Sequence, residues 1–428
     1  MNSDFITYLI EWLADDHELA QQIVYSSNPK DWENKRLVIK PSHFFDDGVF
    51  LTEKTLVDKA NSFLPSRGWI DGMEDVKYIP ILFGTNEVHE ENGKIILYAD
   101  LIASTFYLTT RYEEIVNPIR DSHGRFPAQE SWLMRNGMMH FPIVDEYSDY
   151  IRSLLTKEKK QKHHLKNIYL THDIDTIDFY RHIRGFLGGL WRRQFKSAFN
   201  ALKGLEHDAA YTFPWLIETD SKVPQAQQLY FIKAGNSDRG YDYPMYDLYG
   251  SDMQKLLLLL EDNNVSYGLH CSYAAGEDSS LLAEERNKLQ NVIGKRITST
   301  RYHYLRTCTT DDFQALADMG ITDDFSMGFA QLAGFRMGTC RPIKWINPLT
   351  KTVTNLTLHP LTVMDNSLSE YMKLDAEDSY LYVKDLIEQS VYHGGEISLL
   401  WHNSNFANKP WQKELYTRLI YYIKSISI

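Results

Sequence analysis

The stretch from Asn167 to Asp175, Asn-Ile-Tyr-Leu-Thr-His-Asp-Ile-Asp, constrains the fold of this chain more than any other segment. Apolar Ile168 and Leu170 lead into a polar tip, which is typical of a buried parallel strand whose carboxyl end opens onto a pocket. Asp173 and Asp175 lie two residues apart, so on a strand both carboxylates point the same way. Two carboxylates that close repel each other unless a cation or a shared proton relieves them. A solvated turn is the commoner explanation of an isolated Asp-x-Asp, so the downstream residues must decide.

From Asn167 onward the sequence repeats a pattern of strand, loop and helix. Strands are predicted at 167–172, 229–233, 265–270, 298–303, 321–325, 356–363 and 396–402. Helical patterns, such as those at 280–292 and 376–390, separate several of these strands. About seven strands with crossover helices predict an α/β fold, namely a closed or nearly closed barrel.

The segment 156–166 is polar and basic and has no apolar periodicity, which indicates a linker. We therefore expect a smaller N-terminal α/β domain at 1–160 and the barrel domain at 161–428. Within the first of these, 100–114 has the pattern of a buried helix.

Charge, cysteine content and hydropathy exclude several classes of partner and site. Lys and Arg total 45 against 57 Asp and Glu, and the net charge of −12 argues against a nucleic-acid partner. The three cysteines form no C-x-x-C pair, so neither a disulfide framework nor a thiolate zinc site is expected. The N-terminus lacks the basic region of a signal peptide, and no apolar run is long enough to span a bilayer. A cytoplasmic location is the expectation.

Polar residues end several of the predicted strands. They are His270, Arg301, His303, Asp324 and His402. In α/β barrels the active site forms at the carboxyl ends of the strands, so these side chains are expected to converge with Asp173 and Asp175. One such histidine is usually structural, whereas several at successive strand ends indicate a metal or acid–base site.

These motifs resemble those of the polysaccharide deacetylase family, the metal-dependent NodB-homology N- and O-deacetylases, over about 167–428. The resemblance implies a distorted (β/α)7–8 barrel. It also implies that Asp173 is the catalytic base and Asp175 a metal ligand. His270 matches the family's second motif, but Ala274 stands where a second histidine usually follows.

The later motifs follow in the family's order. Arg301 matches the arginine that holds the base, and His303 replaces the usual proline. Two apart on a strand, His303 can face the pocket beside Arg301 and supply the missing ligand. The resemblance makes Asp324 the carboxylate that orients a catalytic histidine, and His402 that histidine, the general acid.

The implied cofactor is one divalent metal on Asp175, His270 and His303, with zinc expected and cobalt, nickel or manganese as alternatives. The implied activity is deacetylation of an N- or O-acetylated saccharide, either a polysaccharide or a glycan precursor. His359 is a second candidate for the acid. Residues 1–160 resemble the accessory domain of a bacterial branch of these proteins.

Other functions stay open at this point. A deacetylase-like barrel that only binds glycan would explain Ala274. A metal-free hydrolase of another C–N bond could use the same fold. A glycoside hydrolase is less expected, because it needs two carboxylates at least ~5 Å apart across the bond, whereas Asp173 and Asp175 share one strand.

The stretch 179–205 is basic and apolar and contains no Asp or Glu. Its basic residues are Arg181, Arg184, Arg192, Arg193, Lys196 and Lys203. The helical spacing of its apolar residues allows two interpretations. Either a helix packs on the barrel with a solvated basic edge, or the stretch meets an anionic partner, such as a lipid-linked glycan at the inner membrane face.

Overall fold

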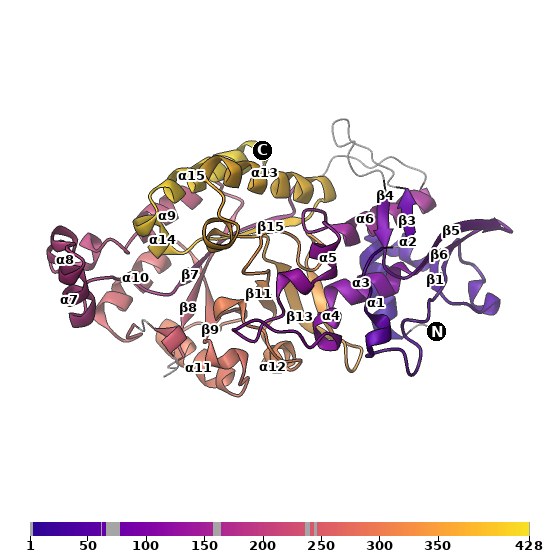
Figure 1. The fold of residues 1–428 in the computed structure, drawn as a ribbon, viewed down its shortest axis with the longest axis horizontal. Coiled ribbons are helices and arrows are strands. Elements are labelled where there is room, and N and C mark those ends of the chain that lie inside the picture. Colours follow the sequence, from indigo (N-terminus) through magenta and orange to yellow (C-terminus); the bar gives the residue numbers. More distant parts are fainter. Residues whose placement is uncertain are drawn as a thin grey trace. The chain divides into compact units, whose positions relative to one another are not determined.

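The computed structural model describes residues 3–60, 62–65, 78–156, 164–235, 240–243 and 246–427. Most of the predicted linker, 157–163, lies outside the described residues. The chain forms two compact units. The first comprises Met1–His164, Gly334–Pro360 and Gln389–Gly395, and the second comprises Leu165–Ala333, Leu361–Glu388 and Glu396–Ile428 (Figure 1).

The first unit is built on a small mixed sheet with the strand order β1-β2-β6-β5. Strands β1 (Ile23–Tyr25), β2 (Leu37–Ile39) and β6 (Lys94–Ala99) are parallel, and β5 (Gly84–Glu91) runs antiparallel to β6. Two antiparallel pairs accompany it, β3 (Ser62–Pro65) with β4 (Tyr78–Ile81), and β12 (Ile343–Asn347) with β13 (Thr352–Pro360). The helices are α1 (Asp4–Ala14), α2 (His17–Gln21), α3 (Leu101–Thr109), α4 (Tyr112–Val116), α5 (Trp132–Arg135) and α6 (Ile143–Thr156).

The predicted single helix at 100–114 is two helices, α3 and α4. Arg111 separates them with φ of 62°, in the left-handed region that an L-residue enters only at a cost. Its guanidinium Nη2 lies 3.2 Å from Glu114 Oε2, and Arg336 Nη2 lies 2.8 Å from Glu114 Oε1. A buried carboxylate between two guanidiniums offsets the loss of hydration of all three groups, and it ties the late segment 334–360 into this unit.

The second unit contains a ladder of parallel strands in the order β11-β10-β9-β8-β7-β15-β14. Every neighbouring pair in this order is parallel. The strands are β7 (Asn167–Ile174), β8 (Gln227–Lys233), β9 (Ser266–Cys271), β10 (Ser299–Tyr302), β11 (Asp323–Met327), β14 (Val363–Met364) and β15 (Glu396–Leu400). The mixed α/β class is confirmed, and the sheet is curled as a half-barrel (Figure 1).

Helices connect and cover these strands. They are α7 (Ile183–Trp191), α8 (Phe195–Ala201), α9 (Phe213–Asp220), α10 (Ser251–Asp262), α11 (Leu281–Ile293), α12 (Asp312–Asp318), α13 (Ala376–His393), α14 (Asn403–Asn408) and α15 (Trp411–Ile426). Strand β7 is buried from Ile168 to its end, as expected for a parallel strand covered on both faces. His172 points to the opposite face from Asp173, and its Nε2 lies 2.9 Å from Asp220 Oδ2.

The strand register brings the polar strand ends together. His270 pairs with Lys233 on one side and with Arg301 on the other. Asp173 lies opposite Phe231 on β8, one position before the end of β7. Because all these strands run the same way, their carboxyl ends meet at one edge of the sheet.

Candidate metal centre and catalytic site

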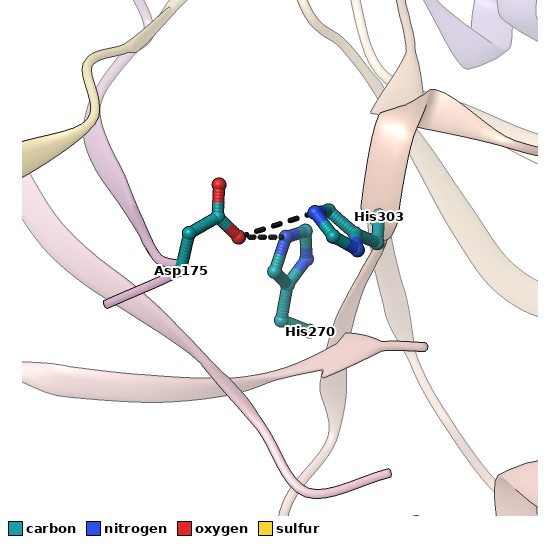
Figure 2. A group of neighbouring side chains, drawn as sticks. All are labelled: Asp175, His270 and His303. Atoms are coloured by element: carbon teal, nitrogen blue, oxygen red, sulfur yellow. Dashed lines mark ion pairs between the residues drawn. The ribbon is translucent and has the colours of Figure 1, made fainter. Parts of the chain in front are cut away.

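Asp175, His270 and His303 converge at this edge, from the ends of β7, β9 and β10 (Figure 2). Asp175 Oδ1 lies 3.4 Å from His270 Nε2 and 3.3 Å from His303 Nε2. The ligand atoms of the three residues all lie within 4.8 Å of one another. Both imidazoles thus face the same carboxylate oxygen.

This arrangement fits a divalent metal. Ligand atoms bound tetrahedrally at about 2.0–2.2 Å are separated from one another by about 3.3–3.6 Å. Asp175 Oδ1 and His270 Nε2 are buried and have no hydrogen-bond partner among the residues that the structure describes. Since buried polar atoms are nearly always paired, two orphaned ligand atoms aimed at each other indicate a site for a cation.

The other ring nitrogen of each histidine is held by the protein. His270 Nδ1 lies 3.0 Å from the Arg301 carbonyl oxygen, and His303 Nδ1 lies 2.8 Å from Asp242 Oδ1. If each Nδ1 carries the proton, both Nε2 atoms are left as acceptors, the state in which an imidazole binds a metal. Burial also lowers the pKa of His303, which favours its neutral form.

Asp242 was not identified from the sequence. It is fully buried in a short turn, and it also accepts the Tyr273 backbone N–H at 2.7 Å. Burial opposes its ionisation, but the hydrogen bond from His303 lowers the pKa of this carboxyl. No predicted strand ends at position 242, so no pattern in the sequence marks it.

Lys233 is a second residue missed by the sequence analysis, and it bears on metal binding. Its buried ammonium lies 3.7 Å from Asp175 Oδ1 and donates to the Asp242 carbonyl oxygen at 3.2 Å. Burial opposes the ionisation of Asp175, but His303, His270 and Lys233 outweigh it and hold the pKa of this carboxyl well below its ordinary value. The rule that found His270, a polar residue at a strand end, would have found Lys233 too.

Asp173 lies beside this cluster and is held by Arg301. Arg301 is fully buried, and its Nη1 donates to Asp173 Oδ1 at 3.0 Å and to Thr171 Oγ1 at 2.8 Å. The other oxygen, Asp173 Oδ2, lies 3.6 Å from His270 Nε2. One carboxylate oxygen is thus fixed by a cation while the other faces the centre.

His402 follows β15 on the other side of Asp175. Its Nε2 lies 3.6 Å from Asp175 Oδ2, and its Nδ1 lies 2.8 Å from Asp365 Oδ1. Asp365 is fully buried and also accepts the His402 backbone N–H and the Asn405 side-chain amide, both at 2.8 Å. Burial opposes the charge on His402, but Asp365 dominates and raises the pKa of this imidazole to about 10.

The predicted pairing of Asp324 with His402 does not match this geometry. Asp324 accepts hydrogen bonds from Thr300 Oγ1 at 2.8 Å and from the Ser326 backbone N–H at 2.8 Å. It is the second residue of β11 and joins β10 to β11, whereas Asp365 directly follows the two-residue strand β14. His359, the other candidate acid, lies in β13 of the first unit. Ala274, at the position where the family usually has a second histidine, begins a single 3-10 turn.

Tyrosines extend from His303 toward solvent. The ring of Tyr304 lies 4.7 Å from that of His303 and 5.4 Å from that of Tyr273, on which Tyr241 is stacked at 4.3 Å. Tyr304 and Tyr241 are both exposed. Tyr304 has φ of 61° and Leu305 φ of 52°, so the chain turns sharply directly after His303.

Comparison with known proteins gives one partial family match. A family model described as "Family of unknown function (DUF7033)" matches residues 2–160. No curated protein sequence matches the chain.

Several solved structures are weakly similar to this chain. A proposed polysaccharide deacetylase from Mycobacterium smegmatis matches with a TM-score of 0.36 and 10% identity, over 63% of this chain and 93% of that one. The Puue allantoinase matches with a TM-score of 0.38 and 14% identity, over 60% of this chain and 83% of that one. A proposed glycoside hydrolase/deacetylase from Parabacteroides distasonis matches with a TM-score of 0.36 and 9% identity, over 63% and 68%. These TM-scores are too low to assign a function.

Proposed function

We propose that this chain is a metal-dependent hydrolase that removes acetyl groups from an N- or O-acetylated saccharide. The observation that carries the proposal is one cluster of three metal-ligand side chains, with Asp173–Arg301 beside it and His402–Asp365 across from it. These are the three kinds of group that hydrolysis of an amide or ester needs, namely a cation site, a base and an acid. We further propose that the second unit is a distorted (β/α)7–8 barrel of the polysaccharide deacetylase type, within a domain at 161–428, and that 1–160 is an accessory domain.

Asp175, His270 and His303 would hold the metal through one oxygen and two Nε2 atoms. A divalent ion there would lower the pKa of a water molecule and polarise the acetyl carbonyl. Three protein ligands are the usual number for a catalytic zinc site, because a further position must be open to substrate.

Asp173 is the proposed base. Arg301 fixes one oxygen of its carboxylate through a hydrogen bond, so the other oxygen can accept a proton from the attacking water. Because Arg301 is itself held by the Phe325 carbonyl oxygen at 3.0 Å, the carboxylate cannot swing away from the centre.

His402 is the proposed acid. With its pKa raised to about 10, the imidazole is protonated at neutral pH and can donate from Nε2 to the leaving amine or alcohol. Asp365 holds Nδ1 and therefore acts as a positioning residue. We assign to Asp365 the orienting role that the sequence analysis gave to Asp324.

The exposed tyrosines next to His303 support a saccharide as substrate. The apolar face of a sugar ring packs on aromatic rings, and a phenol adds a hydroxyl that can bond the sugar's own. Tyr241 and Tyr304 offer such faces beside the cluster of Asp175, His270 and His303.

Lys233 favours one alternative, a metal-free hydrolase of a C–N bond. Its ammonium places a positive charge beside Asp175 where a metal would otherwise provide one. In such an enzyme Asp175 and Lys233 would form a lasting ion pair.

Metal content and acetate release test the proposal together. The full chain, stripped with a chelator and reloaded with zinc, cobalt, nickel or manganese, is assayed on N-acetylated and O-acetylated oligosaccharides. We expect activity to return with one bound metal per chain, and His303→Ala to lose the metal, with exposed His43→Ala as the matched control. Full activity in the stripped protein that is lost in Lys233→Met would establish the metal-free alternative. Metal binding without hydrolysis of any acetylated saccharide would leave a glycan-binding protein.

A further inference from the structure

Helices α7 and α8 expose large apolar side chains to solvent. They lie side by side at the edge of the second unit (Figure 1). On α7 the exposed stripe is Ile183, Leu187 and Trp191, spaced four apart, with Trp191 86% exposed and Ile183 81%. The stripe continues through Phe195, Phe199 and Leu202, each more than half exposed. Isolated apolar residues on a surface are ordinary, but six exposed on two adjacent helices indicate a contact site.

The helices α7 and α8 do have a packed core of their own, so a missing core is not the reason for the exposed stripe. Their inner faces pack around buried Tyr180, Ala198 and Ala201, together with partly buried Phe186 and Leu190. Each helix therefore carries apolar residues on two sides, one satisfied inside the unit and one facing outward. The first interpretation of 179–205, a helix packed on the barrel with a solvated basic edge, does not account for this outward apolar stripe.

The surface around the exposed stripe is basic. Arg184, Arg192, Arg193, Lys196 and Lys203 are all exposed. Arg181 does not belong to this set, because its guanidinium pairs with Asp252. The stretch 179–205 contains no acidic residue, although the whole chain has a net charge of −12. Such a local reversal of sign favours an anionic partner.

We propose that the α7–α8 surface docks on an anionic lipid membrane. Trp191 and the phenylalanines would enter the interface between headgroups and acyl chains, and the five cations would contact lipid phosphates. Among the described residues, none of the helices is long and apolar enough to cross a bilayer. A second copy of the chain is a poor occupant, because a symmetric contact would set the same five cations against one another.

The α7–α8 surface also contacts a residue close in the chain to the candidate site. The Arg184 guanidinium lies 5.3 Å from the Tyr243 ring, two residues after Tyr241 in the tyrosine group beside His303. Docking would therefore hold the tyrosine group close to the bilayer. The docking proposal does not depend on the hydrolase activity.

Vesicle flotation tests the proposal on the full chain. We expect flotation with vesicles of phosphatidylcholine mixed with phosphatidylglycerol at low ionic strength, less at physiological ionic strength, and none with phosphatidylcholine alone. Arg192→Gln/Arg193→Gln should weaken the partition about fivefold per charge removed. The matched control, Lys373→Gln/Lys424→Gln, removes two exposed lysines elsewhere in the unit and should leave the partition unchanged.

The apolar contribution is tested by Trp191→Ser/Phe195→Ser against Leu381→Ser/Tyr421→Ser, a pair outside the surface in which both side chains are more than half exposed. The first pair should lose vesicle binding and the second should keep it. Brominated acyl chains should quench tryptophan fluorescence in the parent protein and not in Trp191→Phe. Absence of flotation at low ionic strength would overturn the proposal, as would equal losses in test and control variants. Self-association that Trp191→Ser/Phe195→Ser abolishes would show instead that a second copy covers the surface.

Discussion

The Lys233 ammonium lies 3.7 Å from Asp175 Oδ1, the same oxygen that faces the Nε2 atoms of His270 and His303. A cation bound by these three residues would therefore have a buried positive charge as a neighbour. Two unit charges about 4 Å apart repel by about 4 kcal/mol at an effective dielectric constant of ~20, so a bound metal must overcome this repulsion.

The first prediction follows from that repulsion. Lys233→Met keeps the length of the buried side chain and removes its charge, so metal affinity should rise at least about tenfold. Competition with a chelator of known affinity measures the change. Lys255→Met, a change at an exposed lysine outside the centre, should leave the affinity as it was. A lower affinity in Lys233→Met would mean that Lys233 supports the metal site.

The second prediction concerns Asp242, which holds His303 from behind. Asp242→Asn keeps the size of the side chain but weakens the hydrogen bond to Nδ1, and the ring loses the orientation and basicity that the carboxylate gives it. Loss of such an outer partner typically lowers metal affinity by about 10–100-fold. Titration of the stripped protein with zinc measures this. Unchanged affinity would exclude His303 as a ligand or Asp242 as its support.

The third prediction separates the base from the ligands. Asp173→Asn leaves Asp175, His270 and His303 intact, so the metal content should be that of the parent. Turnover should fall by about 10²–10⁴-fold, as is typical when a positioned base is lost. Elemental analysis and acetate release on the same preparation provide both numbers. Retained turnover would assign the base to another residue.

The fourth prediction is a shift in the pH profile. The pKa of His402 is raised from 6.5 to about 10, mainly because Asp365 outweighs the effect of burial. An acid with this pKa is active below pH 10 and is lost as the pH rises through it. Asp365→Asn removes the negative charge, so the alkaline limb of kcat/KM should move to lower pH.

Asp324→Asn is the matched control for that shift. Asp324 bonds to Thr300 and Ser326, so its amide variant should leave the alkaline limb in place. The reverse result would restore Asp324 as the partner of His402. The stability of the fold depends on pH in the same direction. Protonated His402 contributes its full stabilisation below pH 6.5, and this contribution is lost as the pH rises toward 10. Asp365→Asn should therefore destabilise the protein most at acidic and neutral pH.

The sequence predicted β7, β8, β9, β10, β11 and β15, because apolar runs ended by polar residues mark both a strand and its direction. The single strand predicted at 356–363 is instead the end of β13 and the start of β14. These strands bring together six side chains that each lie in such a strand or within two residues after it, namely Asp173, Asp175, His270, Arg301, His303 and His402. Asp365 was missed because the strand before it has two residues, too few to form a pattern. Asp242 was missed because it lies in a turn, where position depends on tertiary contacts.

Long-range ion pairs explain why the sequence did not predict that 334–360 belongs to the first unit. Asp145 Oδ1 accepts from Arg341 Nε at 2.6 Å, and its other oxygen accepts from the Cys340 backbone N–H at 2.8 Å. The partners are nearly two hundred residues apart in the chain, so no local pattern associates 334–360 with this unit. Likewise, the left-handed turn at Arg111 that divides the predicted helix depends on Arg336 and Glu114 and not on helix propensity.

The left-handed turn at Tyr304 and Leu305 has a consequence for engineering and for natural variation. An L-residue in this conformation costs about 1–2 kcal/mol, and glycine would remove that cost. Selection for stability alone would therefore favour Tyr304→Gly, at the expense of an aromatic ring beside His303 and of the restricted backbone that aims the imidazole. At position 304, the residue that would give the highest stability therefore differs from the residue that best orients the His303 imidazole.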